Sequence, residues 1–73
     1  MMTKEQLDFE TAMIIAEKKA QGVGPLQATA LELASKDSES SYEQVVCLMR
    51  ELAREGKYRP SVTINKIPIL IPL

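Results

Sequence analysis

Hydrophobic residues recur at helical spacing along the first third of the chain. The segment 4–21 follows Thr3, which with Gln6 forms a capping pattern, and Gly22 ends it. Its apolar positions form two groups, Phe9, Ala12, Met13, Ala16 and Ala20 on one face, and Leu7 and Ile14 roughly opposite, with Ile15 beyond them. Two such groups predict a helix contacted from two sides, by the core and by either a β-segment of the same chain or another subunit.

A second helix is predicted over residues 25–35. Pro25 suits the first turn of a helix, and Leu26, Ala30 and Leu33 then repeat at helical spacing. The polar residues that follow indicate a turn.

A third helix is predicted over residues 41–55. The pattern Ser40-x-x-Glu43 indicates a capping box at its start, and Gly56 fits a cap at its end. Its apolar side chains gather on one side, which predicts a single buried face.

The last part of the chain changes to β-branched residues mixed with prolines. We expect a β-hairpin with strands at about 60–64 and 67–71, joined at Asn65-Lys66, because asparagine tolerates the positive φ of tight turns. Proline cannot donate to a sheet ladder, so these strands are expected at an edge and not in the centre of a sheet.

This order of elements, an α+β arrangement of three helices and a C-terminal hairpin, resembles the winged helix-turn-helix family. The resemblance covers the single domain 1–73 and is carried by PLQATALELAS, SYEQVVCLMRELAREGKY and RPSVTINKIPIL. Only residues 21–24 remain for the short strand that the family usually has between its first two helices. The wing itself carries three prolines and one lysine.

The resemblance implies a DNA-binding transcriptional regulator. Helix 41–55 would lie in the major groove of double-stranded DNA, and the hairpin would reach the flanking backbone. The residues offered to DNA would be Ser41, Glu43, Gln44, Cys47, Arg50 and Arg54 on the helix, and Lys57, Arg59 and Lys66 near the wing. Gln44 would pair with adenine and Arg50 with guanine, while Lys57 and Arg59 would contact phosphates.

Charge supports this reading only locally. The chain has nine basic and ten acidic residues, a net charge of −1, which disfavours non-specific nucleic-acid binding. Residues 48–73 nevertheless carry five basic residues against two acidic ones, a surplus of three. The alternative explanation is structural: basic residues favour helix C-termini, and Arg50 and Arg54 can pair with Glu51 and Glu43.

A second function stays open, that of a protein-interaction module that binds no DNA. The strand Ile67–Leu73 would then add to the sheet edge of a partner or pair with its own copy. A domain this small is also expected to act as a homodimer or with a protein partner. The surfaces expected to dock a partner or a second copy are Leu7, Ile14 and Ile15 on the first helix and Ile67, Ile69 and Ile71 on the last strand.

Composition argues against catalysis. The chain has no histidine and a single cysteine, Cys47, which excludes an internal disulfide, a Cys/His zinc site within one chain and histidine-based acid–base chemistry. No enzyme activity, cofactor or metal is therefore expected. Apolar runs are too short to span a membrane and the N-terminus does not resemble a signal peptide, so we expect a cytoplasmic protein. Such a small, cysteine-poor chain fits a bacterium or a mobile element.

Overall fold

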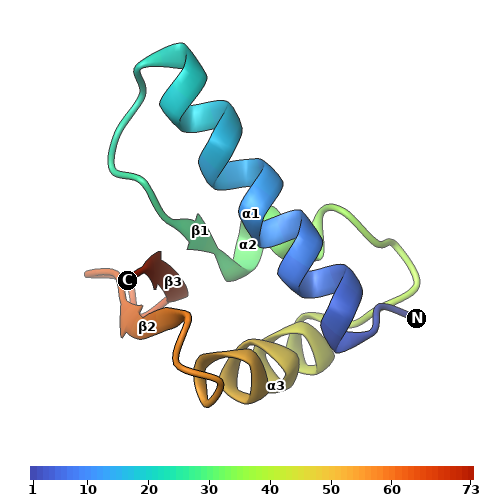
Figure 1. Ribbon diagram of the computed structural model, residues 1–73. Coiled ribbons are helices and arrows are strands. Elements are labelled where there is room, and N and C mark those ends of the chain that lie inside the picture. Colours follow the sequence, from blue (N-terminus) through green and yellow to red (C-terminus); the bar gives the residue numbers. More distant parts are fainter.

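The computed structural model describes all 73 residues and shows an α+β fold with three helices and a three-stranded antiparallel sheet (Figure 1). The predicted α+β class, with three helices and a C-terminal hairpin, is thereby confirmed. The elements follow one another as α1 (Lys4–Gln21), β1 (Ala28–Thr29), α2 (Ala30–Ala34), α3 (Tyr42–Ala53), β2 (Tyr58–Val62) and β3 (Pro68–Pro72). Strand order across the sheet is β1-β3-β2.

Helix α1 has the predicted bounds because both of its ends are set by local side chains and backbone. The Thr3 N–H donates to Gln6 Oε1 at 3.0 Å, and the Gln6 N–H donates to Thr3 Oγ1 at 3.2 Å, which satisfies two N–H groups at the start of the helix. At the other end, Gly22 adopts a φ of 69°, a left-handed conformation that glycine takes without steric cost.

Helix α2 is much shorter than predicted and begins five residues later. Pro25 does not start it; Ala28 and Thr29 instead form a strand. A capping box that the sequence analysis overlooked fixes the start, since the Thr29 N–H donates to Glu32 Oε1 and the Glu32 N–H donates to Thr29 Oγ1. Lys18 also donates to Glu32 and to the Gln27 carbonyl, which holds the preceding segment in an extended path.

Helix α3 lies within its predicted range, but its cap is one residue later than predicted. The capping box is formed by Ser41 and Gln44 instead of Ser40 and Glu43. Ser40 is engaged elsewhere, because its hydroxyl donates to Asp37 Oδ2 and accepts the Met2 N–H. The helix ends at Ala53 with Arg54 at the C-cap.

The hairpin forms with a shifted register, because β2 begins two residues earlier than predicted and β3 one residue later. Thr63 closes the turn: its N–H donates to the Ile67 carbonyl at 2.9 Å, and its carbonyl accepts the Lys66 N–H at 2.9 Å. The residue with positive φ in this turn is Lys66, at 63°, and not Asn65.

Strand β3 lies in the centre of the sheet, so the expectation of an edge position was wrong. The ladder with β2 is hydrogen-bonded at odd-numbered residues, as the bonds Thr63 N–H to Ile67 and Leu73 N–H to Lys57 show. Antiparallel pairs alternate between bonded and non-bonded types. The three prolines stand at even positions, paired as Pro60 with Leu70, Pro68 with Val62 and Pro72 with Tyr58, so none removes a bond from this ladder.

One core joins all the elements. It is built from apolar side chains that are at most 8% exposed, namely Met2, Leu7, Ile14, Ala28, Ala30, Leu33, Val45, Met49, Leu52, Tyr58 and Leu70. Thr11 is also fully buried, where its hydroxyl donates to the Leu7 carbonyl at 2.7 Å. No helix has the length and hydropathy needed to cross a bilayer.

Candidate nucleic-acid interface

Helix α3 turns one face to the core and the opposite face to solvent. Val45, Met49 and Leu52 are buried. The side chains on the opposite side are all exposed and were all predicted to meet DNA: Glu43, Cys47, Arg50 and Arg54. Their spacing of three and four residues places them in one stripe along the helix.

The basic side chains divide into paired and unpaired groups. Lys4, Lys18 and Lys57 form salt bridges, with Glu55, Glu32 and Asp8 respectively. No salt bridge is formed by the other six, which are Lys19, Lys36, Arg50, Arg54, Arg59 and Lys66. Arg50 and Arg54 therefore do not pair with Glu43 or Glu51, which removes the ion-pair explanation for their presence. Arg50 does lie in the last turn of α3, where a cation interacts favourably with the helix dipole.

The hairpin turn brings one of these unpaired cations next to α3. A groove between the two elements is lined by Tyr42, Glu43, Val46, Cys47, Arg50, Lys66 and Pro68. Arg50 and Lys66, sixteen positions apart in the chain, thus lie on the same hollow. Glu43 is the single carboxylate on it.

A second, more apolar groove continues from the first along the sheet. It is lined by Val46, Met49, Arg50, Pro60, Ser61, Val62, Pro68, Ile69 and Leu70. Sequence reasoning missed this groove, because it depends on which strand residues lie opposite α3. Arg50 and Val46 line both grooves, so Arg50 occupies the junction between a charged and an apolar surface.

Two predicted DNA contacts on α3 are engaged in the helix cap. Gln44 Oε1 accepts the Ser41 N–H at 2.9 Å, and Ser41 Oγ accepts the Gln44 N–H at 3.1 Å. A bidentate pairing with adenine uses both the oxygen and the nitrogen of the amide, so Gln44 Oε1 would have to accept a second hydrogen bond while it accepts the Ser41 N–H, or give up the cap.

Lys57 and Arg59, which were predicted to contact phosphates, do not line the groove between α3 and the hairpin turn. Lys57 Nζ lies 2.7 Å from Asp8 Oδ2, and this hydrogen bond, with the charge of Asp8, raises the pKa of Lys57. Arg59 is exposed and unpaired, but its neighbour Tyr58 packs in the core. Because successive strand residues face opposite sides, Arg59 points to the other face of the sheet.

Three of the six residues predicted to meet a partner are buried, and the other three are partly exposed. Leu7, Ile14 and Ile69 are 0%, 5% and 6% exposed, and Ile15, Ile67 and Ile71 are half-buried. Their apolar character is explained by the core and by the central position of β3. Strand β3 is paired along its length with β2, and on its other side β1 pairs with it only at Ile69 and Leu70. The addition of this strand to a partner's sheet stays a prediction.

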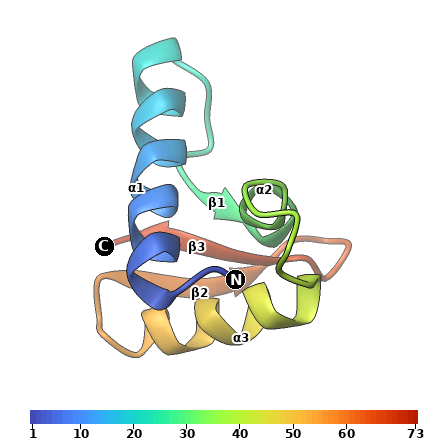
Figure 2. The same ribbon diagram turned by 90° about the vertical axis from the view of Figure 1, so that its right-hand side faces the viewer.

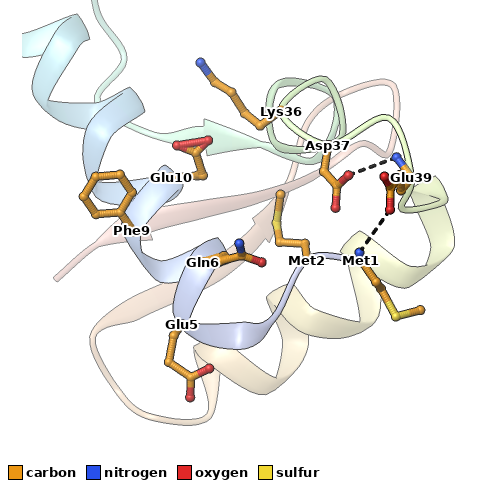
Figure 3. A pocket seen from close by; sticks show the side chains of 9 residues that line it. All are labelled: Met1, Met2, Glu5, Gln6, Phe9, Glu10, Lys36, Asp37 and Glu39. Atoms are coloured by element: carbon orange, nitrogen blue, oxygen red, sulfur yellow. Dashed lines mark hydrogen bonds and ion pairs between the residues drawn. The ribbon is translucent and has the colours of Figure 1, made fainter.

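The largest hollow lies between the start of α1 and the turn that precedes α3 (Figure 3). It measures about 600 Å³ and is lined by Met1, Met2, Glu5, Gln6, Phe9, Glu10, Lys36, Asp37 and Glu39. Asp37 accepts the Glu39 N–H and the Ser40 hydroxyl, and these two hydrogen bonds lower its pKa. Four carboxylates face two cations here, Lys36 and the N-terminal ammonium, which lies 3.6 Å from Glu39 Oε2. The surface is therefore acidic, which is unsuited to DNA.

No family model, no curated protein and no solved structure matches this chain.

Proposed function

We propose that the protein is a DNA-binding transcriptional regulator of the winged helix-turn-helix type. Helix α3 would enter the major groove, and the turn between β2 and β3 would contact the adjacent backbone. The order of elements supports this proposal, because β1 supplies the short strand between the first two helices that the sequence seemed to lack.

The observation that carries the proposal is the position of the unpaired cations. Arg50 and Lys66 line one groove between α3 and the hairpin turn, and Arg54 continues the same stripe on α3. Exposed cations without carboxylate partners are available to phosphates and base edges without first breaking a salt bridge. The other six basic residues are either paired or lie on other surfaces.

The side chains differ in the role they would take. Arg50 is in the last turn of α3 and would donate two hydrogen bonds to a guanine. Lys66, at the turn, and Arg54, at the C-cap, would contact phosphates and set the position of the helix. Glu43, in the same groove, would accept from the amino group of a cytosine. Cys47 lies between them and fits only a close, small contact.

The test is fluorescence anisotropy with a mixed pool of duplex DNA at about 50 and 200 mM salt, a range over which phosphate contacts change affinity strongly. The variant Arg50→Ala with Arg54→Ala is expected to weaken binding and to reduce the slope of log affinity against log salt by about 1 to 2. The control, Lys36→Ala with Arg59→Ala, removes the same charge from two other exposed cations that form no salt bridge.

Comparing the two double variants distinguishes a DNA-binding site on α3 from non-specific attraction between DNA and positive charge. Binding lost in the first pair and kept in the second supports α3 as the contact surface. Equal loss in both would show that only net charge matters, and no salt-dependent binding by the wild-type protein would end the proposal. Circular dichroism on each variant confirms that the helices remain.

A further inference from the structure

The outer face of α1 carries an exposed apolar stripe, which we call the α1 stripe. It consists of Phe9, Ala12, Met13, Ala16 and Ala20, all of them exposed. Phe9 is 64% exposed and Met13 is 42% exposed. The stripe lies directly opposite the buried face of Leu7, Thr11 and Ile14, so no other part of the chain covers it.

The surroundings of the stripe leave room for a partner along its whole length. In Figure 3 the ring of Phe9 lies on the outer side of α1, away from Met2. Figure 2 shows the C-terminal half of α1 projecting beyond the sheet and the other helices. An exposed phenylalanine beside a row of alanines is the pattern in which one helix packs closely on another, with the large side chain against small ones.

One flank of the α1 stripe carries opposite charges that are complementary to the same flank of a second, antiparallel copy. Glu5 and Lys19 lie on the same flank, both are exposed, and neither forms a salt bridge. They are fourteen residues apart, a separation of about 21 Å along the helix. They therefore cannot pair within one chain.

We propose that the protein forms a homodimer in which two copies of α1 pack antiparallel through the α1 stripe. In an antiparallel pair the same flank of each helix faces its copy. If the two-fold axis passes near Ala12, Lys19 of each copy falls beside Glu5 of the other, which forms two salt bridges. Phe9 of each copy then lies at the level of Ile15 in the other, next to Ala16 of the stripe.

The opposite flank of α1 carries Glu10 and Glu17 and no cation. In this register Glu17 falls at the level of Leu7 of the other copy, next to the neutral Gln6 and about 4.5 Å along the axis from Glu10, so this flank forms no salt bridge. The projecting end of each α1 carries the unpaired Lys19. In the dimer this end lies beside the acidic hollow of the other copy, which is lined by Glu5, Phe9 and Glu10. Each copy thus offers a cation and an acidic surface at the two ends of the same stripe.

The test is sedimentation equilibrium without DNA, so that it does not depend on the proposed function. Glu5→Lys and Lys19→Glu are each expected to weaken dimerisation about fivefold, and the double variant Glu5→Lys with Lys19→Glu should restore it. Only contact between two copies can produce this rescue. Phe9→Ala should weaken dimerisation about tenfold or more, while Leu31→Ala, which truncates an exposed leucine on α2, should not.

Three results would overturn the proposal: a wild-type protein that stays monomeric, a double variant no better than the single ones, or a loss with Leu31→Ala equal to that with Phe9→Ala. Circular dichroism distinguishes these from unfolding, since Glu5 lies in the first turn of α1, where a carboxylate favours the helix. Loss of DNA binding with an intact dimer would reject the proposed function alone.

Discussion

Asp8 and Lys57 are joined across 49 positions of the chain, with Lys57 Nζ 2.7 Å from Asp8 Oδ2. The second oxygen of the same carboxylate accepts the Tyr58 hydroxyl at 3.4 Å. One carboxylate on α1 thus holds the first residue of β2 and the residue before it. This contact fixes where the chain turns from α3 back towards the sheet.

The ionisation of Tyr58 should report on this contact. Burial raises the pKa of Tyr58, and the charge of Asp8 and its hydrogen bond raise it further. Asp8→Asn removes the charge, so the pKa of Tyr58 should fall towards its ordinary value of 10.0 while staying above it. Absorbance titration in a Tyr42→Phe background isolates the single tyrosine. Asp37→Asn is the control, and an unchanged Tyr58 in Asp8→Asn would contradict the contact.

Acid should destabilise the protein through two carboxylates with lowered pKa values. Burial of Glu32 would raise its pKa, but hydrogen bonds from Lys18 and Thr29 outweigh this effect and lower the pKa. The pKa of Asp37 is lowered by the hydrogen bond that it accepts from the Glu39 N–H. The unfolded chain therefore binds protons first, and stability should fall as the pH drops below the ordinary values of 4.5 and 3.8.

Urea unfolding at several pH values measures this effect. The combined variant Glu32→Gln with Asp37→Asn should be less stable than the wild type at pH 7, and its stability should depend less on pH in the acid range. If the combined variant and the wild type showed the same pH dependence of stability, the acid sensitivity would come from other carboxylates.

The start of α2 depends on a single threonine. Thr29→Ala removes the acceptor of the Glu32 N–H and should cost about 1 kcal/mol in the free energy of unfolding. Ser38→Ala, in the turn before α3, serves as the control and should change stability by less than about 0.5 kcal/mol. Equal effects of the two substitutions would show that the cap contributes no stability.

The central strand should be the most sensitive part of the sheet. Leu70 is 1% exposed and is paired with both Ala28 and Pro60, so Leu70→Ala should cost about 3 kcal/mol. Leu73, just after β3, is 79% exposed, and Leu73→Ala should have almost no effect. Urea unfolding of the two variants compares them directly, and a small loss for Leu70→Ala would contradict the central position of β3.

Local signals predicted the elements whose ends are set by neighbouring residues. Thr3 with Gln6 and Gly22 bound α1 as expected, and the hairpin appeared within two residues of its predicted position. Pro25 was misleading because a proline permits a helix start but does not require one. The pattern Thr29-x-x-Glu32 was present in the sequence and would have placed α2 correctly.

Features that depend on distant parts of the chain could not be predicted. Which face of α1 is buried, and the central place of β3, depend on contacts with the other elements. The three prolines all occupy even-numbered positions, where the backbone nitrogen faces away from the β2–β3 ladder. The rule against proline in a central strand therefore applies to individual N–H groups and not to the strand as a whole. In the candidate site, exposure of the α3 stripe was predictable, whereas the separation of Arg50 and Lys66 from Lys57 and Arg59 required the structure.

The strand order also sets a sequence of events during synthesis. β1 and β2 do not touch each other and are joined only through β3, whose residues are made after both. While a ribosome still encloses residues 68–72, the emerging chain can form α1 and α3 but has no sheet, and its core lacks the fully buried Leu70. Until β3 emerges, the nascent chain therefore keeps apolar core surface exposed to water.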